Sequence, residues 1–148
     1  MTRAISLSTL LSMSIVYLFT SHTFVSAQQS DWLPYEPTVV QIEGKLLKVI
    51  KYGPPGYGEN PKRDIKYEVP ILLTSEPVRV KGNLSNPKSQ ADLTNVSFIQ
   101  LVFPKSSGNY RRYLDKEIVV EGTLFRAETG GHYTDLLMNV QTIRAKGK

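Results

Sequence analysis

The residue types best suited to chemistry stand together in one short run, GGHYTD, at 130–135. An imidazole can take up a proton near neutral pH, so His132 and Asp135 could serve a hydrolase as general base and orienting group. Such catalysis also requires a nucleophile or a held water, and the chain has no G-x-S-x-G motif. The two glycines are equally typical of a tight turn between strands. In that turn His132 would pack at a barrel end and hydrogen-bond to backbone or to Asp135. We favour the turn.

Metal and cofactor chemistry has little support in the composition. The chain has two histidines and no cysteine, and His22 lies in the segment that we assign below to a leader. A zinc site recruits three or four ligands, and without thiolates it would need carboxylates from elsewhere, such as Glu128. Cysteine nucleophiles are excluded outright. We therefore predict no catalytic residue, no metal ligand and no cofactor.

A second candidate site is GPPGYG at 53–58. Pro55 and Gly56 suit the two central positions of a type II turn, because proline fixes φ and glycine accepts a positive φ. Glycine also lets a loop approach a partner closely, and the ring of Tyr57 could then stack on that partner. We predict that Gly56 and Tyr57, together with His132 and Tyr133, contact a ligand.

Residues 1–27 have the layout of a secretory signal peptide. Arg3 gives a positive start, an apolar run covers 5–19, and the small residues VSA at 25–27 suit a signal peptidase. The apolar run is too short and too serine-broken for a good membrane span of about 20 residues. We predict a periplasmic or secreted protein with no stable transmembrane span after cleavage. The net charge of +5 is spread over interspersed acids and bases, and export argues against nucleic acid as a partner.

Five runs of alternating apolar residues predict strands, at 39–51, 67–73 (continuing through Val80), 96–103, 117–126 and 136–143. In the first run the apolar parity switches after Gly44, which indicates a bulge in a bent strand. Pro70 points to an edge or irregular strand. Ser107 could cap a two-turn helix that ends near Asp115.

Three strands, one short helix and two strands predict an all-β fold, a small five-stranded OB-like Greek-key barrel. The predicted organisation is a signal peptide at 1–27, an N-terminal arm at 28–38 and the barrel at 39–145. The phrases IEGKL and VEGTL at 42–46 and 120–124 support it, because such glycines let barrel strands bend and close. The expected core residues are Leu46, Val69, Leu101, Val120, Leu124, Met138 and Val140.

Several of these motifs, in this order, resemble the bacterial domain-of-unknown-function family 4431. They are V-x-x-x-G-x-L in the first strand, GPPGY, IQLVF at 99–103, I-V-V-x-G-T-L-F-x-A at 118–127 and G-H-Y-T-D-L-L at 131–137. The family usually has asparagine where this chain has Gly56, and a second histidine where it has Tyr133. That second departure counts against any mechanism needing a histidine pair. The resemblance implies an exported bacterial protein and supplies no reaction.

These observations favour a non-catalytic binding module for an envelope protein, a peptide or a small polar ligand. The alternatives are a hydrolase using His132 and Asp135, and an accessory or immunity-like subunit of an envelope factor. If the strands alternate in direction, GPPGYG and GGHYTD leave opposite ends of the barrel. They would then flank the face on which OB-folds bind their ligands.

Overall fold

The apolar runs fold into six strands and one short helical turn. The structure, a computed structural model, describes residues 32–82, 91–104 and 110–147. The predicted leader at 1–27 lies outside this part of the chain. The five predicted strands are confirmed, and the fold is all-β. The elements are β1 (Leu33–Pro34), β2 (Val39–Tyr52), β3 (Lys66–Lys81), β4 (Leu93–Val102), the 3-10 turn η1 (Tyr110–Tyr113), β5 (Glu117–Arg126) and β6 (Leu136–Ala145).

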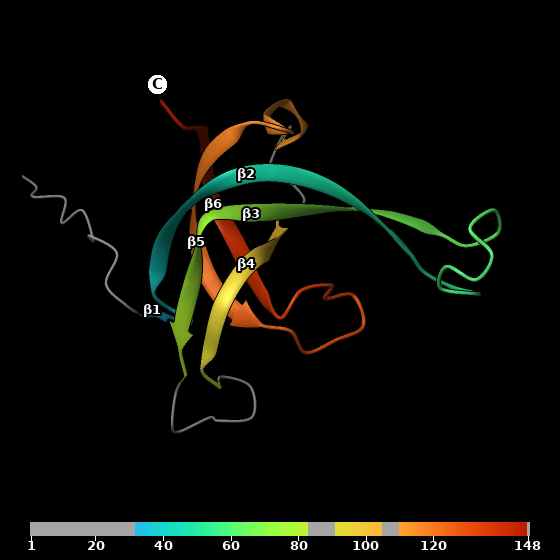
Figure 1. The fold of residues 1–148 in the computed structure, drawn as a ribbon, viewed down its shortest axis with the longest axis horizontal. Helices are drawn as coiled ribbons and strands as arrows, with labels where there is room; N and C mark the ends of the chain where they lie inside the picture. The colour runs from blue at the N-terminus through green and yellow to red at the C-terminus, as the bar shows by residue number, and fades with distance from the viewer. Residues whose placement is uncertain (1–31, 83–90, 105–109, 148) are drawn as a thin grey trace, which may run out of the picture. The chain divides into compact units, whose positions relative to one another are not determined.

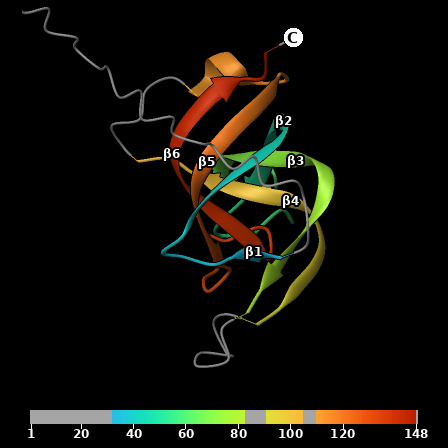
Figure 2. The ribbon, with the colours of Figure 1, turned by 90° about the vertical axis from the view of Figure 1, so that its left-hand side faces the viewer.

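Five of the strands close into a ring. β2 pairs antiparallel with both β3 and β5, and β5 pairs antiparallel with β6. β4 completes the ring, because it pairs antiparallel with β3 and parallel with β6. Figure 1 shows β2 arching across the ring, and Figure 2 shows the same strands from the side. This strand order is compatible with the predicted OB-like barrel.

The seven predicted core residues are all buried. Six of them belong to one apolar cluster to which all five ring strands contribute, and Val69 lies outside that cluster. The alternation that identified them is the two-residue period of a strand with one face turned inward. The six are Leu46, Leu101, Val120, Leu124, Met138 and Val140.

Gly44 and Gly122 allow neighbouring strands to come close. A Cβ on Gly44 would collide with the carbonyl oxygen of Leu73, and one on Gly122 with that of Asn139. The predicted bulge at Gly44 is wrong. The β2–β3 register runs unbroken from Gly44 to Tyr52, and the β2–β5 register runs unbroken from Val39 through Gly44 to Lys45.

The parity switch in β2 has a different cause, a second apolar layer on the outer face of the ring. Leu47 pairs with Ile71 and Val49 pairs with Val69, and both β3 partners are buried outside the inner cluster. Leu137 of β6 is buried outside that cluster too. Strands covered on both faces carry apolar residues at successive positions, as these do.

Two shorter elements flank the ring. β1 pairs parallel with the end of β3, so the described part of the predicted arm at 28–38 packs on the domain. Tyr35 behind it is buried and its hydroxyl donates to the carbonyl of Ala91 (2.8 Å). In place of the predicted two-turn helix, the described residues hold the single 3-10 turn η1, and Ser107 lies outside them.

Candidate binding surface on the β2–β3 arm

The last part of β2 and the first part of β3 leave the ring together as a hairpin of residues 47–70. This hairpin is called the arm from this point on, and it is distinct from the N-terminal arm predicted at 28–38. β2 has no β5 partner after Lys45, and β3 has no β4 partner before Ile71. Pro70 stands at this boundary, where its missing N–H cannot extend the ladder, so the predicted edge position is confirmed. Figure 1 shows the arm projecting to the right of the ring and ending in a loop.

The loop at the tip of the arm, residues 53–65, is organised by Asp64. Its carboxylate accepts hydrogen bonds from the backbone N–H groups of Gly56 (2.8 Å), Gly58 (2.8 Å) and Asn60 (3.2 Å). Although it carries a charge, Asp64 is only 6% exposed, because these three donors replace water. Sequence reasoning missed Asp64. The available signal was an aspartate closing a glycine-rich turn, since Asp side chains commonly bond turn backbone.

The predicted type II turn at Pro55 and Gly56 is wrong. That turn requires a positive φ at Gly56, whereas the positive φ values here belong to Tyr57 (50°) and Gly58 (109°). Gly56 is needed for space instead, because a Cβ there would lie 3.0 Å from a carboxylate oxygen of Asp64. The tip is therefore built around a buried carboxylate rather than around a proline–glycine turn.

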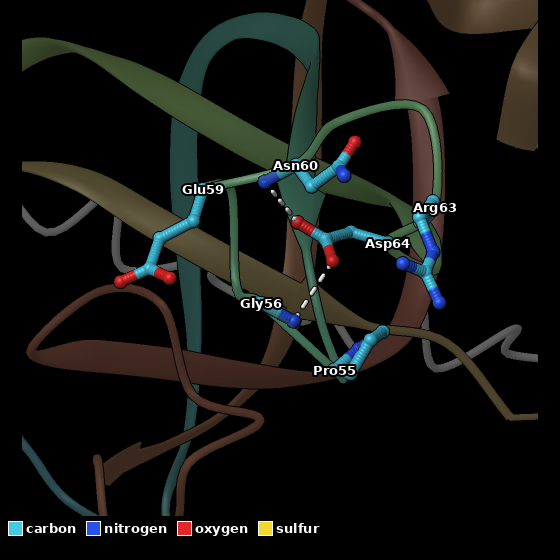
Figure 3. A pocket seen from close by; sticks show the side chains of 6 residues that line it. All are labelled: Pro55, Gly56, Glu59, Asn60, Arg63 and Asp64. Atoms are coloured by element: carbon cyan, nitrogen blue, oxygen red, sulfur yellow. Dashed lines mark hydrogen bonds between the residues drawn. The ribbon is translucent and has the colours of Figure 1, made fainter.

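A shallow hollow of about 330 Å³ opens beside this carboxylate. Figure 3 shows the Asp64 carboxylate between the backbones of Gly56 and Asn60, with the Glu59 side chain pointing away from it. Both carboxylate oxygens already accept backbone hydrogen bonds. A polar ligand in the hollow would therefore bind chiefly to the side chains of Glu59, Asn60 and Arg63, which also line it.

Acid should loosen the tip loop. Burial alone would raise the pKa of the Asp64 carboxyl, but the backbone hydrogen bonds from Gly58, Gly56 and Asn60 outweigh it and hold this pKa below its usual value. The stabilisation is therefore complete above the unfolded-state pKa of about 3.9 and is lost as pH falls through the lower pKa of the folded protein. As the pH falls from 5 through that lower pKa, the amide protons of Gly56 and Gly58 should show the largest upfield NMR shifts.

Asp64→Asn is the control for this titration, because it carries no titrating group at position 64. Its tip-loop amides should be displaced from the wild-type positions already at pH 5 and should not move further on acidification. The amide of the buried Ile99 reports on unfolding of the ring itself. Gly56 and Gly58 amide resonances of the wild type that coincide at pH 5 with those of Asp64→Asn would contradict the role given to Asp64.

The arm carries most of the exposed large apolar side chains of the described residues. Four of seven lie on it, and Tyr57 at the tip is 72% exposed. Residues paired across a hairpin share one face. Tyr67 pairs with Lys51 and Ile50 pairs with Glu68, so both faces of the arm present an apolar residue. The four are Ile50, Tyr57, Ile65 and Tyr67.

Basic side chains surround the strands of the arm. Glu68 accepts a hydrogen bond from Lys48 Nζ (3.1 Å) and forms an ion pair with Arg111 of η1 (2.8 Å). The Lys48 hydrogen bond, followed by the charge of Arg111, lowers the pKa of Glu68. Lys66 Nζ lies 5.9 Å from the centre of the Tyr52 ring. The single negative charge of Glu68 is thus shared between Lys48 and Arg111, so this group of side chains keeps a net positive charge.

His132 has a structural role in the β5–β6 loop. Its Nδ1 accepts hydrogen bonds from the backbone N–H groups of Glu128 (2.9 Å) and Thr129 (3.3 Å). Its ring meets Phe125 edge-on, with centroids 5.6 Å apart. Asp135 contributes its backbone carbonyl to Ala127 (3.1 Å). Of the two partners foreseen for a packed His132, backbone and Asp135, the structure shows the backbone.

Gln100 of β4 fixes this loop on the outer face of the ring. Its side chain donates to the carbonyl of Gly131 (3.2 Å) and accepts from the N–H of Tyr133 (2.7 Å). Its own N–H donates to Thr134 Oγ1 (3.0 Å). Sequence reasoning missed Gln100 too, although a lone amide inside the apolar run IQLVF was a visible signal for a buried polar contact.

The two candidate loops are not at opposite ends of the barrel. Lys51, two residues before Gly53, places Nζ 5.8 Å from the centre of the Tyr133 ring, so the side chain of a β2 residue near the tip loop reaches the β5–β6 loop. The expectation failed because it treated β2 as one straight strand. β2 instead pairs with β5 along one half and with β3 along the other, and the loop folds back over the outer face. Gly56 and Tyr57 lie farther out, at the tip.

Within residues 32–82, 91–104 and 110–147, histidine and carboxylate side chains form no group of three or more able to hold a metal ion. In the same ranges no helix is long and apolar enough to cross a membrane.

The protein has an all-β fold and matches a family model over part of its length. It is an all-β domain whose five strands close into a ring. Residues 98–144 match the model of a Domain of unknown function (DUF4431), so the resemblance drawn from the motifs is confirmed over that stretch. The match includes IQLVF, the β5 motif and G-H-Y-T-D-L-L, while the two earlier motifs lie outside it. Searches of curated proteins and of solved structures gave no significant match.

Proposed function

We propose that this protein is a non-catalytic binding module of the bacterial cell envelope that takes a protein or peptide partner on the arm. The observation that carries the proposal is the concentration of exposed apolar side chains on this one hairpin. Exposed large apolar side chains that concentrate on one part of a surface are typical of interaction sites, and here they occupy the tip and both faces of one projecting hairpin. Tyrosine is enriched at interaction sites because it buries a large ring at low entropic cost.

The sequence pattern at 1–27 supports the envelope location, because export through a signal peptide delivers the domain there. An accessory or immunity-like subunit is one form of the same proposal, since its partner is also an envelope protein. The hollow at the tip supports a second candidate, a small polar ligand held by Glu59, Asn60 and Arg63.

The hydrolase alternative has less support. A general base needs a free lone pair, and Nδ1 of His132 already accepts two backbone hydrogen bonds. Nε2 is the remaining ring nitrogen. In the neutral ring it carries the proton, because Nδ1 acts as acceptor.

A site-specific photocrosslinker tests the proposal in cells. The full chain carries p-benzoylphenylalanine in place of Tyr57, at the exposed tip, and is irradiated in growing bacteria. The matched control carries it in place of Gln141, an exposed residue of β6 away from the arm. We expect a discrete crosslinked species from position 57 and none from 141. Equal crosslinking from both positions, or none from 57, would sink the proposal.

A further inference from the structure

Within the described ranges, no strand pairs with the outer edge of β2 along the arm. Beyond Lys45, β2 pairs with β3 alone among the described residues. Leu46 closes the ring end of this edge, because its N–H donates to Lys116 (3.1 Å) and its carbonyl accepts from Asp115 (2.8 Å). From there to Tyr52 the structure describes no backbone hydrogen bond on the outer side of β2.

The direction of the edge groups follows from strand alternation. In an antiparallel pair, every second residue bonds the partner and the residues between turn their N–H and C=O outward. Gly53 N–H donates to Ile65 O (2.8 Å) and therefore faces β3. Lys48, Ile50 and Tyr52 have the opposite parity, so their three N–H and three C=O groups face out. Leu46 has this parity too, and it bonds residues outside the hairpin, as expected.

The two edges of the arm differ in how well their backbone groups could pair with an added strand. The β3 edge is interrupted at Pro70, which has no N–H to offer. The β2 edge has no proline from Lys48 to Tyr52 and places the exposed Ile50 at its centre. A strand that adds to β2 would therefore find an unbroken row of backbone partners and one apolar contact.

The charge around this edge selects the partner. Four cations, Lys48, Lys51, Lys66 and Arg111, lie around this edge, and Glu68 pairs with two of them, Lys48 and Arg111. Lys51 and Lys66 lie over tyrosine rings and leave their charge available. An acidic strand would gain from these cations, whereas a second copy of this chain would bring two sets of cations together.

We propose that an extended, acidic peptide segment of a partner protein adds as a strand to the outer edge of β2, centred on Ile50. This inference rests on the proposed function, because it identifies the chemistry of the partner that the arm takes. Strand addition gives affinity through main-chain hydrogen bonds, and side chains on alternate faces give specificity. Here one face of the added strand meets Lys48 and the other meets Lys51.

Fluorescence anisotropy tests the proposal with a labelled peptide, acetyl-Glu-Glu-Thr-Val-Thr-Glu-Glu-amide, and its lysine-for-glutamate counterpart. Ile50→Pro removes the central outward N–H, and Ile50→Ala removes the same apolar side chain but keeps that N–H. We expect the acidic peptide to bind the wild type, to lose about tenfold or more in affinity for Ile50→Pro, and to lose about threefold or less for Ile50→Ala. The basic peptide should not bind.

A second measurement covers the case in which Ile50→Pro fails to fold. Wild-type protein is titrated with two versions of the acidic peptide, one N-methylated on its odd-numbered amides and the other on its even-numbered amides. Only the version whose unmethylated N–H groups face β2 should bind, because alternate amides of a strand face its partner. Three outcomes would overturn strand addition by an acidic segment. They are equal losses of affinity for Ile50→Pro and Ile50→Ala, equal binding of the two methylated peptides, and binding of the basic peptide. So would dimers of this chain that form through the β2 edge. Crosslinking from position 57 without any peptide binding would overturn this inference alone and leave the proposed function standing.

Discussion

Gly44→Ala should force β2 and β3 apart and should lower the free energy of unfolding by about 3 kcal/mol or more. Gly44 pairs with Thr74 of β3 and with Ile118 of β5, so the backbones of two strands flank it. The new methyl group would collide with the Leu73 carbonyl oxygen, which no side-chain rotation can move. Relief requires β2 and β3 to separate, and this weakens ladder hydrogen bonds at the bend.

Urea unfolding followed by circular dichroism measures this loss. Gly130→Ala is the matched control, because a Cβ there meets nothing within 4 Å, and it should change stability by about 0.5 kcal/mol or less. Gly122→Ala should behave like Gly44→Ala, since its methyl group would meet the Asn139 carbonyl. If Gly44→Ala unfolded at the same urea concentration as Gly130→Ala, the close approach of β2 and β3 would be disproved.

Leu124→Ala should lower the free energy of unfolding by about 2–5 kcal/mol. Leu124 is fully buried in the inner cluster and pairs with Met138, which is buried there as well. The truncation leaves a cavity that a close-packed ring cannot readily fill, so the lost transfer energy and the cavity add.

Gln141→Ala on the exposed side of β6 is the comparison for Leu124→Ala. It should leave the melting temperature nearly unchanged. A melting temperature for Leu124→Ala equal to that of Gln141→Ala would mean that the β5 register is shifted by one residue, because a one-residue slip moves every side chain to the other face.

The strands could be predicted from the sequence because strand alternation is local. Each of the five runs shows its buried residues within its own length, and the observed β5 has the predicted limits. The echo of IEGKL and VEGTL was informative for the same reason, since each glycine reports a crowded point on its own strand. The burial of Leu46, Leu124 and Met138 followed from these patterns.

The candidate surface was less accessible, because it depends on contacts between distant parts of the chain. Gln100 and Gly131 lie 31 residues apart in sequence, and nothing near either of them shows that they meet. The outer apolar layer also interrupts the alternation in β2, so the sequence predicts a bulge where the strand is in fact covered on both faces. Asp64 was overlooked because its partners are backbone groups, which carry no side-chain signature.

The Asp64 carboxylate at the tip of the arm would influence the rate and the affinity with which a partner binds Tyr57. A loop tied by three hydrogen bonds to a buried charge has already lost most of its conformational freedom before any encounter. Binding would then add mainly the ordering of the tyrosine side chain itself, about 0.5–1.5 kcal/mol. A preorganised tip of this kind removes a loop rearrangement from the association step. Differences in affinity among partners would consequently appear in their dissociation rates.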